Sequence, residues 1–295
     1  TISDTLKGLF LTKPGLNKLG YELIIHLIND GSTDNTEKLA NQHREILVIN
    51  HKNNRGLGAA VRTGLLSANN INADIVVKYD ADLQHEPFDI LALIKPIDND
   101  ESDNSFGFAF TPEPNSDAAV VALNWSLYRT DDETFTNSIS PGSFYGITFL
   151  HELSHAVGLK HPHELGLHRQ PRFPGLFRSS DEFKDKGQFE QNAHPFTQLS
   201  YVDKGARNGY VPRAAEDHGF LKSLGALDTA ALQWLYGLNS AHASNNDVYY
   251  LPRSNRARTG WRCIWDTGGI DCIDGSKTNK SVLIDLRNAT LDSSI

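Results

Sequence analysis

The chain has 295 residues, of which 39% are apolar and 22% charged, a balance typical of a globular protein with room for one large domain or two ordinary ones. The formal net charge is −8, which argues against the basic surface of a nucleic-acid-binding protein. No apolar run approaches the roughly 20 residues needed to cross a bilayer, so we expect a soluble chain. The N-terminus shows no signal-peptide pattern and the sequence contains no Met, as in a fragment or a processed product.

The first part of the chain, to about residue 97, alternates strands and helices. A short apolar run at residues 21–28 is consistent with a buried parallel strand, and a second and a third strand are predicted at 46–49 and 74–79. A glycine-containing loop at residues 54–58 leads into a helix that we expect to continue through Ala68. Strand–helix–strand order at this spacing predicts an open α/β sheet.

Three aspartates follow the first and third of these strands, namely Asp30, Asp80 and Asp82. In open α/β sheets ligands bind beyond the carboxyl ends of the strands, so these carboxylates are candidate ligand contacts. Each Asp alone is more simply interpreted as a turn residue or a helix cap.

The pattern changes at a polar run that starts at Asp98, and we interpret residues 98–104 as a linker. Beyond it the strand–helix rhythm disappears and the loops lengthen. We expect helices at about residues 143–158 and 228–236, and short strands at 248–251 and 281–285. The spacing of Cys263 and Cys272 would suit a cross-strand disulfide in a hairpin, but two free thiols are equally possible.

The strongest motif is the stretch of residues 151–162, His-Glu-Leu-Ser-His-Ala-Val-Gly-Leu-Lys-His-Pro. His151 and His155 are four residues apart, so on a helix both imidazoles project from one face and can bind one metal ion. Gly158 allows the helix to stop and the chain to turn sharply, which brings His161 round as a third ligand. The sequence therefore predicts a zinc site with three histidine ligands.

Glu152 neighbours the first ligand and is the candidate general base of this site. Three neutral imidazoles leave one tetrahedral position open for water, whose pKa zinc can lower from about 15.7 to about 7. Glu152 would take a proton from the attacking water and deliver it to the leaving amine of a peptide. The alternative is a surface helix that carries histidines by chance, which requires three His, one Glu and one Gly all to fall at the required places.

The motif HExxHxxGxxH followed by Pro resembles the metzincins, and residues 150–164 look like the serralysin group of secreted bacterial alkaline proteases. The resemblance implies an α+β catalytic domain, a zinc cofactor, protein or peptide substrates, and secretion. That family has a Met-turn beneath the zinc, which residues 195–201 match. Tyr201 corresponds to a tyrosine that can ligate the metal at rest and hydrogen-bond the oxyanion during turnover. Leu199 stands in place of the Met. We expect the packing beneath the metal to be looser and the activity to be retained, because Leu and Met have similar volumes and their exchange usually costs less than about 1.5 kcal/mol.

Two further stretches are similar to the same family. Residues 225–239 resemble the helix that closes the catalytic domain, and residues 265–274 resemble the start of a calcium-binding β-roll. Asp266, Gly268 and Asp271 match one half of a family calcium site, where carboxylate and backbone oxygens suit a hard cation. The partner stretch at residues 243–247 departs from the family pattern, and an Asp-Gly turn in a hairpin is the plain alternative.

Residues 28–36, 53–65 and 79–85 resemble family 2 glycosyltransferases, near the dolichyl-phosphate mannose synthases. In that family the Asp matching Asp30 contacts the nucleotide, and the pair matching Asp80 and Asp82 holds a divalent metal on the diphosphate. The family's first strand should precede Thr1, and its acceptor half should follow Ile97, where protease-like sequence stands instead. We therefore expect a truncated, catalytically dead fragment in which the three aspartates are vestigial.

The resemblances together predict four segments: a glycosyltransferase-like α/β fragment at 1–97, a linker at 98–104, a zinc metalloprotease catalytic domain at 105–240, and the start of a β-roll-like region at 241–295. The leading hypothesis is a zinc endopeptidase. The alternatives are a nucleotide-sugar-dependent family 2 glycosyltransferase and an inert fusion of two gene fragments. Four histidines that the motif does not use are interpreted as surface residues: His163, His168, His194 and His218.

Overall fold

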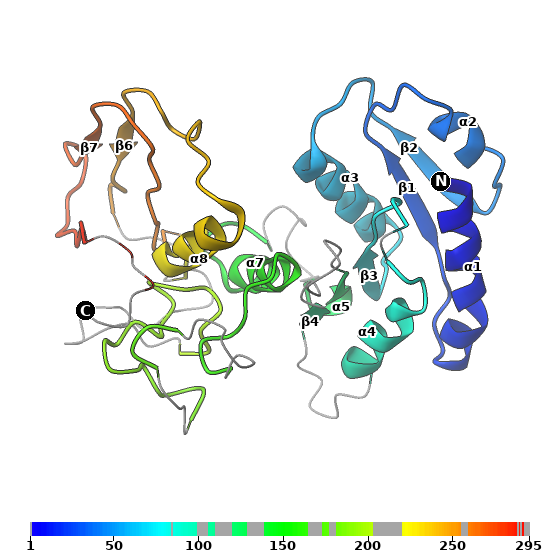
Figure 1. Ribbon diagram of the computed structural model, residues 1–295, viewed down its shortest axis with the longest axis horizontal. Coiled ribbons are helices and arrows are strands. Elements are labelled where there is room, and N and C mark those ends of the chain that lie inside the picture. The colour runs from blue at the N-terminus through cyan, green and yellow to red at the C-terminus, as the bar shows by residue number, and fades with distance from the viewer. Residues whose placement is uncertain are drawn as a thin grey trace. The chain divides into compact units, whose positions relative to one another are not determined.

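The computed structural model describes residues 2–83, 85–98, 106–109, 120–128, 139–164, 173–176, 181–202, 220–254, 259–287, 289 and 291. The chain divides into two compact units, Thr1–Phe135 and Thr136–Ile295, which are coloured from blue to green and from green to red in Figure 1. Among the described helices, none combines the length and the apolar character that crossing a membrane requires.

The first unit begins with alternating helices and strands, which in chain order are α1 (Ile2–Lys18), β1 (Ile25–Asn29), α2 (Thr36–Ala40), β2 (Ile46–Asn50), α3 (Leu57–Asn70), β3 (Ile75–Lys78) and α4 (Asp89–Asp98). The strands β1 and β2 are parallel, with Ile25 opposite Ile46. A parallel pair needs a crossover connection, which α2 provides. The three strands predicted in this part of the chain are therefore confirmed, with ends shifted by up to four residues.

The third strand lies in a different sheet. Two short strands follow α4, namely β4 (Gly107–Ala109) and β5 (Val121–Asn124), and β5 leads into the short helix α5 (Trp125–Tyr128). β3 pairs antiparallel with β5, and β5 pairs antiparallel with β4. The fold is mixed α/β, but in the described residues it differs from the single open sheet that the sequence predicts. The first unit also extends past the linker predicted at residues 98–104, because β4 and β5 supply the partners of β3.

The core of the first unit lies between helices α1 and α4 and the strands. One buried cluster consists of Leu9, Leu16, Ile90 and Ile94, and a second consists of Leu93, Ile97, Val120 and Ala122. Two glycines of α1 allow the close approach of the segment that carries α4. A Cβ at Gly8 would lie 2.6 Å from Cγ of Pro87, and one at Gly15 would lie 2.7 Å from Cδ1 of Leu91. A larger side chain at either position would therefore push the two helices apart.

The second unit contains the helices α7 (Phe144–Ala156) and α8 (Ala226–Tyr236) and the strands β6 (Val248–Tyr250) and β7 (Cys272–Asp274). β6 and β7 are parallel, with Val248 opposite Cys272. The predictions of both helices and of the strand at 248–251 are confirmed. The strand predicted at 281–285 is wrong, because those residues have no strand partner in the described part of the chain and Leu283 is 70% exposed. Cys263 and Cys272 are free thiols.

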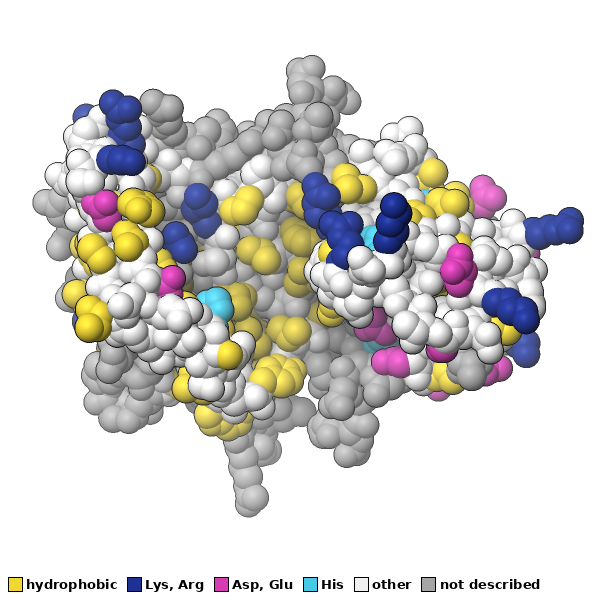
Figure 2. Space-filling model, turned by 90° about the horizontal axis from the view of Figure 1, so that it is seen from above, with side chains coloured by type: hydrophobic (Ala, Val, Ile, Leu, Met, Phe, Trp, Pro, Cys, Tyr) yellow, Lys and Arg dark blue, Asp and Glu magenta, His cyan; other side chains and the backbone are white. Residues whose placement is uncertain are grey.

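Charged side chains of both signs lie on the face of the molecule shown in Figure 2, interspersed with hydrophobic side chains.

Candidate metal centre

The helix α7 carries the first two predicted zinc ligands, and its two ends are set by local sequence. Ser143 is the N-cap residue, and its hydroxyl accepts a hydrogen bond from the backbone N–H of Gly146. The helix ends at Ala156, and Gly158 has a φ of +89°, the left-handed conformation that favours glycine. The chain therefore leaves the helix in a sharp turn and carries His161 back toward His151 and His155.

The structure brings the three predicted ligands together at their Nε2 atoms. The separations are 3.1 Å between His151 and His155, 3.0 Å between His151 and His161, and 3.0 Å between His155 and His161. Zinc–imidazole distances are about 2.0–2.1 Å. The centre of this triangle is nearer than that to each corner, so the three nitrogens are close enough together to hold one zinc ion.

Each of the three imidazoles has an oxygen acceptor at its Nδ1 atom. His151 faces the carbonyl of Gln198 at 3.0 Å, His155 faces the carbonyl of Leu159 at 2.8 Å, and His161 faces the carboxylate of Glu164 at 2.5 Å. A neutral imidazole carries one proton, and an oxygen acceptor at Nδ1 keeps the proton there. All three Nε2 atoms therefore present lone pairs to one another, an arrangement that a shared cation stabilises.

Burial keeps the imidazoles of His151 and His155 neutral. It lowers the pKa of His151 to about 3, with a further contribution from the neighbouring His155, and it lowers the pKa of His155 to about 4. A neutral imidazole is the form that ligates a metal. The donor set fits zinc, which prefers nitrogen ligands in tetrahedral sites.

The carboxyl group of Glu152 lies on the same helix and is 8% exposed. Burial raises its pKa to about 7. A carboxyl group with a pKa near neutrality exchanges protons readily at physiological pH, which suits an acid–base role.

The ring of Tyr201 stacks on His151 with centroids 5.9 Å apart and lies 4.7 Å from His161. The ring of Tyr201 also stacks on that of Phe183, with centroids 5.4 Å apart, and its centroid lies 5.0 Å from that of His163. Burial, followed by nearby carboxylates, raises the pKa of its phenol to about 12. The hydroxyl therefore keeps its proton at neutral pH and can donate a hydrogen bond.

A buried hydrogen-bond network supports the segment that precedes Tyr201. Asp228, at the start of α8, accepts hydrogen bonds from the hydroxyl of Thr197 at 2.5 Å, the backbone N–H of Gln198 at 2.9 Å and the backbone N–H of Gly225 at 2.8 Å. The side chain of Gln198 donates to the carbonyl of Leu150 at 3.2 Å and contacts the hydroxyl of Ser154. The network links α8 to the helix that carries the ligands, and the sequence analysis did not find it. The Asp that follows Gly225 by three residues, as in a capping box, is the one local signal of it.

Leu199, which stands where the resemblance places a Met, is 2% exposed. It lines a cavity of about 340 Å³ together with the segment from Gly158 to Pro162 and side chains of α8 that include Ala231 and Trp234. The cavity lies beside His161, so the wall that Leu199 forms is part of the surroundings of the metal centre.

The prediction that His163 lies on the surface is wrong. Its side chain is 15% exposed, its ring stacks on that of His161 with centroids 5.0 Å apart, and its Nε2 lies 3.3 Å from Oε2 of Glu182. His194 is also half-buried, with its ring 5.5 Å from that of Phe220. His168 and His218 lie outside the described residues.

Two of the residues predicted to bind calcium lie close together. Asp266 and Asp271 form a cluster with Asp247, in which one carboxylate oxygen from each residue lies within 4.8 Å of the other two. The backbone N–H of Gly268 donates to Asp266 at 3.0 Å, so this glycine supports a carboxylate of the cluster. Asp247 was missed as a candidate because it lies in the stretch that departs from the family pattern.

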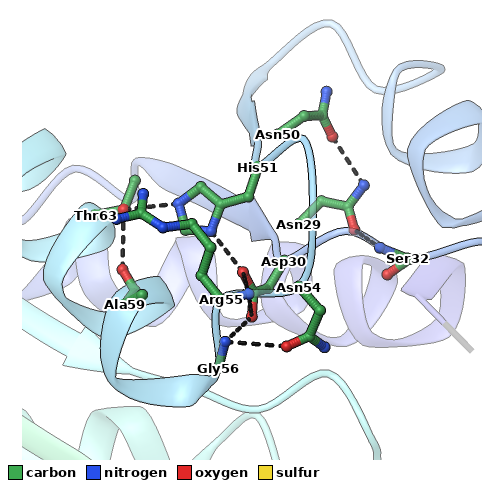
Figure 3. Close-up of polar contacts among 10 residues, drawn as sticks. All are labelled: Asn29, Asp30, Ser32, Asn50, His51, Asn54, Arg55, Gly56, Ala59 and Thr63. Carbon is green, nitrogen blue, oxygen red and sulfur yellow. Dashed lines mark hydrogen bonds and ion pairs between the residues drawn. The ribbon is translucent and has the colours of Figure 1, made fainter.

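The carboxylate of Asp30, in the first unit, forms hydrogen bonds with neighbouring groups of the chain (Figure 3). Its oxygens accept hydrogen bonds from the backbone N–H groups of Arg55 and Gly56 at 2.7 to 3.1 Å, and Oδ1 lies 2.6 Å from Nδ1 of His51. The other ring nitrogen of His51 lies 2.8 Å from the hydroxyl of Thr63. These hydrogen bonds, chiefly the one from His51, lower the pKa of Asp30, and they fix the loop that leads into α3.

The two other predicted aspartates of this unit follow β3. Asp80 forms an ion pair with Lys78, and Nε2 of the buried His85 lies 3.9 Å from it. Asp82 is exposed. In the part of the chain that the structure describes, no group of three metal-ligating side chains includes Asp30, Asp80 or Asp82.

Comparisons with known proteins match both parts of the chain. The family model of glycosyl transferase family 2 matches residues 6–154. A UDP-N-acetylglucosamine–dolichyl-phosphate N-acetylglucosaminyltransferase of Methanococcus voltae is 37% identical over 108 residues, which are 31% of this chain and 43% of that protein.

The serralysins of Proteus mirabilis and Photorhabdus sp. (strain Az29) are 25% and 28% identical, over 206 and 203 residues. Each alignment covers 63% of this chain and 39% or 37% of the relative. The chain thus spans less than half the length of each of these relatives.

The serralysin alignments and the family model together exceed the length of the chain, so the two similarities overlap. This overlap agrees with a first unit that extends past the linker predicted at residues 98–104. Through residues 6–154 the chain belongs to glycosyl transferase family 2, and it carries in addition a region that is similar to the serralysins.

Proposed function

We propose that the second unit is a zinc-dependent endopeptidase whose metal is held by His151, His155 and His161. The observation that carries this proposal is the convergence of three Nε2 atoms within 3.0 to 3.1 Å, each on an imidazole whose Nδ1 already has an oxygen acceptor. A zinc ion bound there supplies a Lewis acid that polarises a peptide carbonyl and acidifies a water molecule.

The residues around the ion have distinct roles in this proposal. Glu152 is the general base, because its buried carboxyl group, with a pKa of about 7, can take a proton from water and return it to the leaving amine nitrogen. Tyr201 keeps its phenolic proton and donates a hydrogen bond to the carbonyl oxygen as negative charge develops on it. Asp228 and Gln198 hold the segment beneath the ligands in place.

The similarity to the serralysins supports this function and favours unfolded proteins or peptides as substrates. It also favours secretion, which we propose as the location of the protein.

The decisive experiment is cleavage of an unfolded protein by the purified full chain, with and without a zinc chelator. Wild type is compared with Glu152→Gln and with the exposed control Glu45→Gln. We expect Glu152→Gln to retain zinc but to lose about 10²–10⁴-fold in turnover, the usual contribution of a general base. Glu45→Gln should match wild type. Full activity of Glu152→Gln would contradict the assignment of the base, and cleavage that resists the chelator would contradict the zinc mechanism.

Calcium binding at Asp266, Gly268 and Asp271, with Asp247 added by the structure, is a second part of the proposal. Three carboxylates that each have one oxygen within 4.8 Å of the other two suit a hard cation. Millimolar calcium should raise the melting temperature of the chain and should not raise that of an Asp271→Asn variant. An equal response of the two proteins would contradict a site here.

A second candidate function, nucleotide-sugar-dependent transfer by the first unit, is favoured by the family match over residues 6–154. Against it stand the hydrogen bonds that occupy Asp30 and the ion pair between Asp80 and Lys78. Calorimetric titration with a UDP-sugar in the presence of manganese separates the two cases. Micromolar binding of the UDP-sugar that Asp80→Asn abolishes would support the transferase. No binding of the UDP-sugar would favour the interpretation of the three aspartates as vestigial. A folded chain with neither zinc nor nucleotide-sugar binding would favour the inert fusion.

A further inference from the structure

The three candidate zinc ligands differ in the group that accepts the proton of Nδ1. For His151 and His155 the acceptor is a neutral backbone carbonyl, at 3.0 and 2.8 Å. For His161 it is the carboxylate of Glu164, at 2.5 Å. One of the three ligands therefore has a charged partner.

The same ligand also has the weakest support from secondary structure. His151 and His155 lie on α7, where the helix fixes their backbone, whereas His161 lies beyond the helix end, after Gly158. Its position depends on the turn of residues 161–164, in which the backbone N–H of Glu164 donates to the carbonyl of His161 at 3.1 Å. Pro162 occupies the second position of this turn, where its fixed φ is favoured. The turn places the carboxylate of Glu164 against the ring of His161.

We propose that Glu164 is a positioning residue that fixes the orientation of His161 and thereby sets the affinity of the site for zinc. The inference rests on the proposed zinc function. A carboxylate at Nδ1 holds the ring in the tautomer whose Nε2 is free, and its negative charge makes that nitrogen a stronger donor to a cation. A carbonyl dipole in the same place supplies the orientation without the full charge.

A second Glu–His pair in the same region provides a matched control. Oε2 of Glu182 lies 3.3 Å from Nε2 of His163, and the side chains of Glu182 and Glu164 are 45% and 43% exposed. The two carboxylates are thus similar in exposure and in partner. They differ in that His161 belongs to the converging set of three Nε2 atoms and His163 does not. Since the charge removed is the same, a general electrostatic effect would change both variants alike.

The experiment measures the zinc dissociation constant of the full chain by competition with a chelator of known affinity. Glu164→Gln keeps an acceptor for Nδ1 and removes the charge, and Glu164→Leu removes both. Loss of an outer-shell partner typically costs about 10–100-fold in metal affinity. We expect Glu164→Leu to fall in that range, Glu164→Gln to fall between Leu and wild type, and the Gln and Leu variants of Glu182 to stay within about twofold of wild type. The visible spectrum of the cobalt-loaded protein should change for the Glu164 variants and stay constant for the Glu182 variants, a difference that a general loss of stability would not produce.

Equal zinc affinities of wild type and Glu164→Leu would overturn the inference, as would equal losses in the Glu164 and Glu182 variants. Another overturning result is a Glu164→Gln variant as weak as Glu164→Leu that also lacks the cobalt spectrum of a three-histidine site, because Glu164 would then itself be a ligand. The readout does not require proteolysis. Graded affinities in a chain that cleaves nothing would support the inference and contradict the proposed protease, whereas a wild-type chain that binds no zinc would overturn both.

Discussion

Two polar sites of the chain, Asp30 in the first unit and the three converging histidines in the second, are satisfied in different ways. In the first unit the carboxylate of Asp30 is surrounded by hydrogen-bond donors of the chain itself, from His51, Arg55 and Gly56. In the second unit the Nδ1 atoms of three histidines are satisfied, but their Nε2 atoms face one another without a donor between them. A polar group that already has partners stabilises the fold, whereas converging lone pairs repel one another unless a cation lies between them. The comparison locates the candidate chemistry of this chain in its second unit.

The largest effect that would test this comparison is the loss of the metal. His155→Ala removes one of three ligands and should reduce zinc from one ion per chain to none, measured by elemental analysis after dialysis. His163→Ala removes a neighbouring histidine that does not belong to the converging set, and it should keep the ion. Retention of stoichiometric zinc in His155→Ala would contradict the assignment of His155 as a ligand.

The next effect concerns the support of the site. Asp228→Ala leaves the donors at Thr197, Gln198 and Gly225 without their common buried acceptor. We expect a loss of about 3 kcal/mol in the free energy of unfolding, because a buried donor without a partner costs about 1–3 kcal/mol. Denaturant unfolding followed by circular dichroism measures this loss. Asp181→Ala, which breaks an exposed pair with Lys184, should leave the free energy of unfolding close to that of wild type.

A smaller effect tests whether Asp30 is a structural residue. Its pKa is lowered from an ordinary value of 3.8, chiefly by the hydrogen bond from His51. A lowered pKa in the folded state means that the ionised carboxylate stabilises the fold above pH 3.8 and that this contribution is lost as the pH falls through the lowered value. Unfolding midpoints measured between pH 6 and pH 2 should fall less for Asp30→Asn than for wild type. Parallel curves for the two proteins would show that Asp30 does not stabilise the fold.

The smallest effect is expected at Leu199. Leu199→Met restores the residue that the resemblance places beneath the metal, and the two side chains have similar volumes. The stability should change by less than about 1.5 kcal/mol and the zinc content should not change. A large gain in proteolysis would show that the leucine weakens the site.

Much of the candidate metal centre could be predicted because its proposed ligands are close in sequence. His151 and His155 are one helical turn apart, and Gly158 signals the turn that returns His161. The supporting residues could not be predicted in the same way, because Asp228 reaches Gln198 across 30 residues. Glu164 lies in the stretch 150–164 that resembles the serralysins, but its contact with the ring of His161 depends on the turn of residues 161–164.

The fold of the first unit was less accessible from the sequence. The helix α1 was not predicted, since Gly8, Pro14 and Gly15 interrupt its helical pattern. The need for glycine at positions 8 and 15 follows from the close approach of the segment that carries α4, which the sequence does not show. The strand β3 was found from its apolar run, but an apolar run does not identify its partner. That partner, β5, begins at Val121, beyond the predicted linker.

The antiparallel pairing of β3 with β5 decides where the chain can be divided for production in parts. A cut in residues 98–104 would deprive Val76 and Val77 of the strand that pairs with them and would expose the row of amide and carbonyl groups along β3. Unpaired apolar edges of this kind recruit strands from other molecules and lead to aggregation. A fragment that ends near residue 135 keeps the pairing and should stay dispersed, whereas one that ends at residue 97 should precipitate.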